Sequence, residues 1–138
     1  NFYMNLQEKK DYLKQYRQLD SEIRQLLLEK SEIFELGTKI TPTYSAVPKG
    51  TGSGDKIQST IEKLEKQEDK INQKIEQRMK VKEEIETALN TVTEERLKLL
   101  LRYRYINGCT WEDIAAKMCY SYMHVYRLHG KALNAMML

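Results

Sequence analysis

The feature that most constrains this chain is a heptad pattern that runs from Ile57 to Val92. Its positions follow one another at alternating spacings of four and three residues, and eight of the eleven hold Ile, Leu or Val. Such a repeat places apolar side chains along one stripe of an α-helix, where they pack against another helix. We therefore expect a long coiled-coil helix, with Glu68, Arg78 and Lys82 as polar interruptions. The positions of this predicted seam are 57, 61, 64, 68, 71, 75, 78, 82, 85, 89 and 92.

A second amphipathic segment precedes this helix. Its apolar residues recur at spacings of three, four or seven, with Lys30 as a break: Leu6, Leu13, Tyr16, Leu19, Ile23, Leu26, Ile33 and Leu36. The spacing predicts a helix of about 30 residues. Residues 37–54 separate the two segments and contain both prolines and the run Gly-Thr-Gly-Ser-Gly, which disfavour helix. We expect an antiparallel coiled-coil hairpin over residues 1–92, with residues 37–54 as its linker.

Two helices that pack only on each other each bury a single stripe, so a hairpin of this kind is expected to pack on a further surface as well. That surface could belong to a second copy of the chain or to another protein. We expect a second copy, which makes the predicted hairpin the contact of a homodimer. A monomeric hairpin with a purely intramolecular seam is the alternative.

The positive charge of the chain is concentrated near its C-terminus. Residues 1–93 hold sixteen basic and sixteen acidic side chains, whereas residues 94–138 hold seven basic and four acidic ones, which accounts for the net charge of +3. A local excess of this sign favours a polyanionic partner. Cys109 and Cys119 are not spaced as a redox motif, and no stretch has the length and apolar character of a membrane span or a leader. We expect a cytoplasmic protein with reduced thiols and no membrane contact.

Residues 93–138 carry the signals of three short helices. Thr91 is a candidate cap for the first, which is expected to end at Asn107-Gly108 because glycine tolerates the left-handed conformation that follows a helix. Thr110 is the expected cap of the second helix, with Asp113 three residues further on, and Ser121 is the expected cap of the third.

The last two of these helices match a helix-turn-helix in the spacing of their apolar residues, and Cys119 stands where the turn most often has glycine. We therefore predict an all-α fold in which a small helix-turn-helix DNA-binding head, residues 93–138, follows the coiled-coil hairpin. The matching apolar positions are Ile114, Ala115, Met118, Tyr120, Val125 and Leu128.

The candidate DNA-binding residues are those of the last two helices that the core does not need. Arg127 is expected to contact guanine or phosphate, Tyr122 or Met123 thymine methyl groups, and the hydroxyls of Thr110 and Ser121 phosphates. The full predicted set is Thr110, Lys117, Ser121, Tyr122, Met123, His124, Tyr126, Arg127 and Lys131. The alternative is a compact helical cap in which Tyr122 and Tyr126 are packing residues.

Two runs of residues near the C-terminus resemble a known family. The run Leu-Leu-Leu-Arg-Tyr-Arg-Tyr-Ile-Asn-Gly-Cys-Thr-Trp-Glu-Asp-Ile-Ala-Ala, residues 99–116, is followed by Tyr-Ser-Tyr-Met-His-Val-Tyr-Arg-Leu-His-Gly-Lys-Ala-Leu, residues 120–133. Together they resemble the promoter-reading C-terminal domain of bacterial sigma factors, and more closely phage transcriptional regulators of the RinA type. The resemblance implies a phage or prophage regulator in a bacterial host cell that binds promoter DNA and contacts RNA polymerase. The chain departs from that family at Tyr122-Met123, where members usually carry basic residues.

Other functions are less well matched by the sequence. We expect no enzymatic activity and no cofactor, because no catalytic grouping or phosphate-binding glycine motif stands out. Cys109, Cys119, His124 and His129 have poor spacing for zinc, so we expect no metal site. Two alternatives to a transcription regulator stay open: a phage DNA-packaging subunit resembling a small terminase, which would assemble into a ring, and a coiled-coil module that binds protein.

Overall fold

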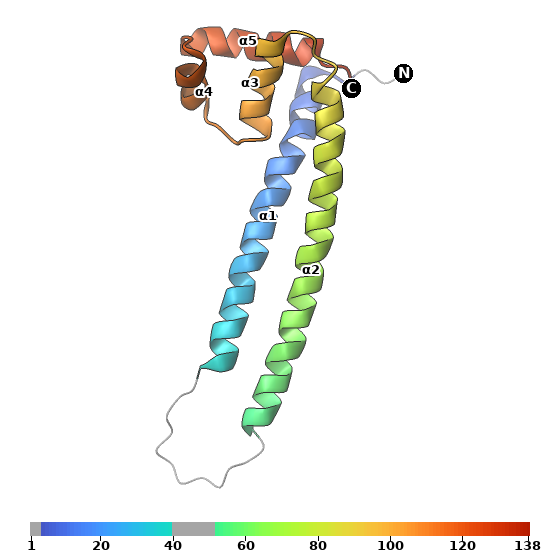
Figure 1. The fold of residues 1–138 in the computed structure, drawn as a ribbon, viewed down its shortest axis with the longest axis vertical. Coiled ribbons are helices and arrows are strands. Elements are labelled where there is room, and N and C mark those ends of the chain that lie inside the picture. Colours follow the sequence, from blue (N-terminus) through green and yellow to red (C-terminus); the bar gives the residue numbers. More distant parts are fainter. Residues whose placement is uncertain (1–3, 40–51) are drawn as a thin grey trace. The chain divides into compact units, whose positions relative to one another are not determined.

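A computed structural model of the chain describes residues 4–39 and 52–138. Within these ranges the structure consists of α-helices and contains no strand, which confirms the predicted all-α class (Figure 1). The helices are α1 (Leu6–Thr38), α2 (Gly52–Leu89), α3 (Glu95–Tyr105), α4 (Trp111–Met118) and α5 (Tyr122–Ala135). None of these helices is long and apolar enough to cross a membrane.

The chain forms two compact units, and α1 and α2 contribute to both. Unit 1 contains the residues up to Asp20 together with Gln77–Leu138, and unit 2 contains Ser21–Glu76. The division therefore does not follow the expected boundary between residues 92 and 93. The reason is that the first turns of α1 and the last turns of α2 share a core with α3, α4 and α5.

The core of unit 1 is built from all five helices and the segment after α2. Its completely enclosed side chains come from segments far apart in the sequence, so none of these segments buries its apolar face alone. The largest of them are Leu13, Ile85, Leu89, Val92, Leu100, Leu101, Ile114, Val125, Leu133 and Met136.

Two polar contacts reinforce the packing of unit 1. The Arg102 guanidinium donates two hydrogen bonds of 2.7 Å to the two carboxylate oxygens of Glu86, which joins α3 to α2. The Lys9 ammonium donates 2.8 Å hydrogen bonds to the carbonyls of Leu133 and Met136, which joins α1 to the C-terminal end of α5. The last carbonyls of a helix lack partners within the helix, so Lys9 supplies one of the missing contacts.

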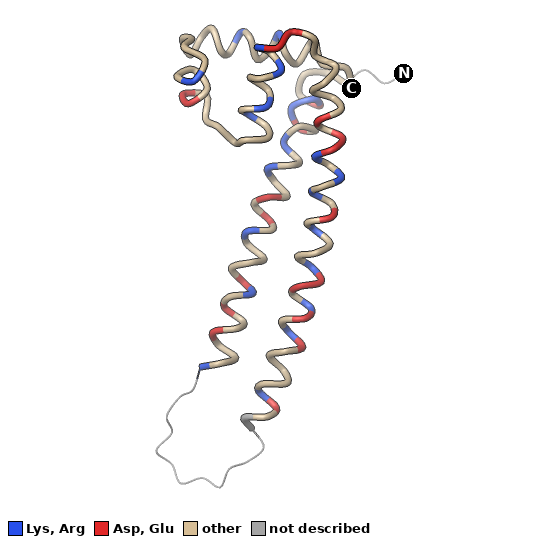
Figure 2. The backbone as a smooth tube through the Cα atoms, viewed as in Figure 1, with Lys and Arg blue, Asp and Glu red and all other residues tan. Residues whose placement is uncertain are grey.

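In unit 2, α1 and α2 run antiparallel and side by side (Figure 1). Ile23 and Ile71 are buried. Ion pairs of 3.0 Å connect Lys30 to Glu68. A second pair of the same length, Lys74 with Glu22, connects the helices one heptad away. Acidic and basic residues alternate along both helices, as expected for the solvated flanks of a coiled coil (Figure 2).

The buried stripe of α2 differs in part from the predicted seam. Positions 64, 71, 78 and 85 face inward at least partly, but positions 60, 67 and 81 are buried in place of their neighbours 61, 68 and 82. Ile57 and Ile61, two predicted seam positions, are 57% and 43% exposed, so they are not enclosed by the contact between α1 and α2. The helix tolerates this rotation because its buried polar groups are hydrogen-bonded. The Gln67 amide donates to the Leu26 carbonyl at 2.9 Å, and the Thr60 hydroxyl donates to the Lys56 carbonyl at 2.7 Å.

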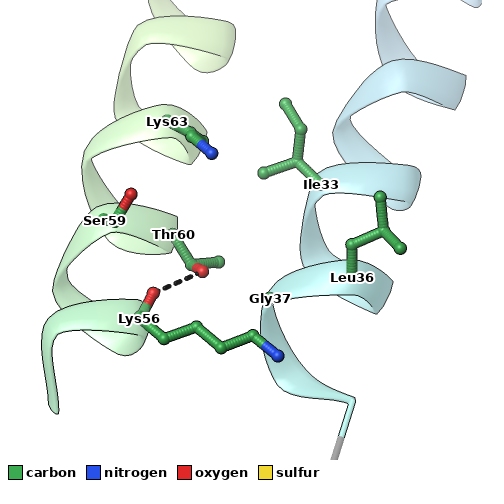
Figure 3. Close-up of a pocket in the computed structure, with 7 residues that line it drawn as sticks. All are labelled: Ile33, Leu36, Gly37, Lys56, Ser59, Thr60 and Lys63. Atoms are coloured by element: carbon green, nitrogen blue, oxygen red, sulfur yellow. Dashed lines mark hydrogen bonds between the residues drawn. The ribbon is translucent and has the colours of Figure 1, made fainter. Parts of the chain in front are cut away.

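The predicted linker, residues 37–54, was too long at both ends, because Gly37 and Thr38 close α1 and Gly52 begins α2. Residues 40–51 lie outside the described part. Gly37 suits its place because a Cβ atom there would overlap the Thr60 side chain. Beside this close approach lies a pocket of about 190 Å³ whose apolar wall is formed by Ile33 and Leu36 (Figure 3).

Candidate nucleic-acid interface

Helices α4 and α5 are joined by a turn of three residues, 119–121, and the predicted caps of both helices are confirmed. The Thr110 hydroxyl accepts a 3.1 Å hydrogen bond from the Asp113 N–H and caps α4. The Ser121 hydroxyl accepts a 3.2 Å hydrogen bond from the His124 N–H and caps α5. Cys119 has φ 59°, the left-handed conformation that glycine usually supplies at this place.

The expected start of α3 was wrong. Its N-cap is Glu94, which makes no side-chain capping bond. The Thr91 hydroxyl instead donates to the Ala88 carbonyl at 2.6 Å and accepts a 2.8 Å hydrogen bond from the Met137 N–H. Thr91 therefore links the end of α2 to the C-terminal segment through its two hydrogen bonds and does not cap α3. The expected end is confirmed, because α3 closes at Tyr105 and Gly108 has φ 71°.

The apolar positions of the helix-turn-helix pattern lie as predicted. Ile114, Val125 and Leu128 are buried in the core of unit 1, and the remaining three, Ala115, Met118 and Tyr120, are partly buried against it. On α5, His129, Ala132 and Leu133 are buried on the same side as Val125 and Leu128, and the opposite side of the helix faces outward.

The outward face of α5 carries two adjoining rows of predicted DNA-binding residues. Met123, Arg127 and Lys131 are spaced four apart and all are exposed. Tyr122 and Tyr126 form the second row and are 48% and 61% exposed. The interpretation of these two tyrosines as packing residues of the core is not supported by this exposure.

The other predicted residues are less uniformly placed. Thr110 and Ser121 are exposed, and each hydroxyl keeps a hydrogen to donate although its oxygen is used in capping. Lys117 is exposed and lies 3.5 Å from the Cys109 sulfur. His124 is only half-exposed, because its ring packs edge-on against Tyr120 with centroids 4.5 Å apart.

Ion pairs offset much of the positive charge in residues 94–138. The Arg96 guanidinium lies 2.7 Å from the Glu94 carboxylate. Three further bases are also paired: Lys98 with Glu95, Arg102 with Glu86, and Lys131 with Glu94. The basic side chains of this segment that make no ion pair with a described residue are Arg104, Lys117 and Arg127. Fewer basic side chains of this segment are therefore available to an anionic partner than the sequence indicated.

The structure adds basic residues that sequence reasoning did not assign to the site. Lys10 and Lys14 of α1 line a groove together with Arg104, and Tyr122 and Tyr126 of α5 line the same groove. The sequence signal for this basic surface was the spacing of Lys10, Lys14 and Arg17, which places them on one face of a helix. In a helix that also carries many acidic residues, such a spacing resembles an ordinary solvent-exposed face.

A polar cluster of Tyr105 and His129, both buried, forms part of the lining of this groove. The Tyr105 hydroxyl and the Nε2 atom of His129 are 2.8 Å apart and hydrogen-bonded, and the His129 ring packs edge-on against Trp111. Burial, together with the smaller effect of the positive charges of Lys10 and Arg104, lowers the pKa of His129 to about 4. Burial also raises the pKa of Tyr105 to about 12, against the opposing effect of Arg104. Both side chains are therefore neutral at pH 7.

Comparisons of this chain with protein-family models, curated proteins and solved structures found no match. Any assignment of function therefore depends on the residues and their geometry.

Proposed function

We propose that this chain is a DNA-binding transcription regulator that contacts promoter DNA through α4 and α5, with α5 as the recognition helix. The proposal includes a coiled-coil stalk formed by α1 and α2 and a homodimer formed through it. It assigns no catalytic step. The resemblance to RinA-type regulators supports a phage or prophage origin and RNA polymerase as a further partner.

The observation that carries the proposal is the two-sided character of α5. One side, with Val125 and Leu128, is buried, whereas the other presents Met123, Tyr126 and Arg127 to solvent. An α-helix with exposed aromatic, apolar and basic side chains fits the major groove, where arginine pairs with guanine and apolar groups contact thymine methyls. The start of α5, which Ser121 caps, places these side chains on a regular helical backbone.

We expect the full chain to bind double-stranded DNA with an affinity that falls as salt rises. The measurement is fluorescence anisotropy of labelled random-sequence and phage-promoter duplexes over a salt series. Each phosphate contact should contribute about −0.9 to the slope of log K against log salt concentration. Arg127→Ala should weaken binding to a preferred duplex roughly 5- to 150-fold, as expected for loss of a base-contacting arginine.

A matched control is Lys66→Ala, which removes the same charge from an exposed position in unit 2 and should leave binding nearly unchanged. If the wild-type chain does not bind any duplex at low salt, the DNA-binding proposal fails and a protein-binding head becomes the leading interpretation.

The proposed dimer is supported by apolar side chains that unit 2 leaves exposed. Leu27 and Phe34 are 47% and 56% exposed and lie seven residues apart on one face of α1. On α2, Ile57 and Ile61 are 57% and 43% exposed. Exposed apolar residues at heptad spacing are typical of a surface that packs against another helix.

Replacing both Leu27 and Phe34 with glutamate should convert a dimer into a monomer of 16.3 kDa, because burying like charges at a helix contact is unfavourable. The measurement is the molar mass by light scattering during size-exclusion chromatography. Gln25→Glu is the control, because residue 25 is exposed and lies about half a helical turn away from residues 27 and 34. A wild-type monomer would contradict the dimer, and a large ring would favour the DNA-packaging alternative.

A further inference from the structure

The charged side chains that line the groove between α1 and the C-terminal helices are all basic. Lys10, Lys14 and Arg104 line it, and no described Asp or Glu does. The groove has a volume of about 190 Å³. A second pocket of the same volume shares Lys14 and Arg104 with it and is also lined by Arg17 and Gly108. Arg17 itself lies 3.6 Å from Asp20.

The positive charges of Lys10, Lys14 and Arg104 are not neutralised by a described carboxylate, so they can bind an anionic ligand. Lys10 and Lys14 make no hydrogen bond or ion pair with a described residue, so their ammonium groups have no competing carboxylate. Arg104 is fixed from two sides. Its guanidinium donates to the Cys109 carbonyl at 3.1 Å and lies 4.4 Å from the centre of the Trp111 ring. Neither contact neutralises its charge.

The groove is continuous with the proposed recognition helix. Tyr122 and Tyr126, which form one exposed row of α5, are part of its lining. A ligand that follows the groove therefore passes from the face of α5 to the basic residues of α1. A phosphodiester backbone has the required length, negative charge and regular spacing.

We propose that Lys10, Lys14 and Arg104 form a phosphate-binding track for the DNA strand that borders the groove read by α5. This proposal rests on the DNA-binding function proposed above and extends its interface to α1. Contacts with phosphates position a protein on the duplex and raise its affinity without reading sequence. The N-terminal helix is then part of the DNA-binding surface and not only a stalk.

The test is the double variant Lys10→Ala/Lys14→Ala in the full chain, assayed by anisotropy with the random-sequence and promoter duplexes. Two lost phosphate contacts should make the slope of log K against log salt concentration shallower by about 1.8. The affinity should fall by a similar factor for every duplex, and Lys10→Arg/Lys14→Arg should retain wild-type behaviour. Trp111 fluorescence and helical circular dichroism establish that the variants are folded.

The control is Lys80→Ala/Lys82→Ala, which removes two exposed lysines from α2 in the same unit and should leave the slope unchanged. If the wild type binds DNA and the Lys10/Lys14 variant keeps its slope, the phosphate track is overturned while the DNA-binding function stands. An equal loss of slope in the control pair would also overturn it, because the effect would then reflect net charge alone. If the wild type does not bind DNA, both proposals fail together.

Discussion

Replacing Leu13 with alanine is expected to lower the free energy of unfolding of unit 1 by about 2 to 5 kcal/mol, the usual cost of emptying a leucine site in a core. Leu13 lies in α1, yet it is fully buried and belongs to the same core cluster as side chains of α3, α4 and α5. The measurement is denaturant unfolding followed by Trp111 fluorescence, which reports on unit 1 because Trp111 is the only tryptophan. A substitution 98 residues away should thus shift the transition that Trp111 reports.

The matched control is Leu6→Ala in the same helix and the same unit. Leu6 is 41% exposed, so its truncation should cost about 1 kcal/mol or less. If Leu13→Ala leaves the Trp111 transition at its wild-type position, α3, α4 and α5 fold without α1, and the shared core described above has no energetic role.

Acidification is expected to weaken unit 1 through His129. The pKa of this histidine is lowered by burial from 6.5 to about 4 in the folded chain. Above pH 6.5 the imidazole is neutral in both states, so this part of the stability is fully present. Between pH 6.5 and 4 the unfolded chain binds a proton that the folded chain does not, so stability falls as the pH falls. The loss should reach about 3 kcal/mol at pH 4.

The measurement is a series of denaturant titrations from pH 7.5 to pH 4, compared with His129→Gln. Glutamine does not titrate in this range, and its amide oxygen can accept a hydrogen bond from the Tyr105 hydroxyl. The variant should therefore lose stability less steeply as the pH falls, whatever its stability at pH 7. NMR titration of the wild type gives a second readout, and a His129 pKa near 6.5 would contradict the expected acid sensitivity.

The elements that depend on local chemistry were predictable from the sequence. Thr110 and Ser121 cap their helices because a hydroxyl three residues before a free N–H can accept its hydrogen bond. Gly108 takes positive φ for an equally local reason. The existence of two long helices followed from apolar spacing over many turns. None of these features requires knowledge of a distant partner.

The errors occur where a partner decides the outcome. Thr91 has the sequence of a helix cap, but the N–H of Met137 reaches its hydroxyl from the other end of the unit. Ile61 has the sequence of a seam residue, yet Thr60 is buried in its place because α1 packs on a slightly different face of α2. A heptad pattern defines a broad apolar stripe, and the neighbouring helix selects which side of that stripe is enclosed.

The sequence by itself determined the helical class, the caps of the last two helices and the inward and outward faces of α5, because these depend on residues within a few turns of one another. Only the tertiary structure decided which charges are free. Lys10, Lys14 and Arg104 are unremarkable along the chain, and they become one cationic groove only when α1 packs beside the C-terminal helices. Electrostatic fields depend on distance in space, and separation along the sequence does not fix that distance until the core has formed.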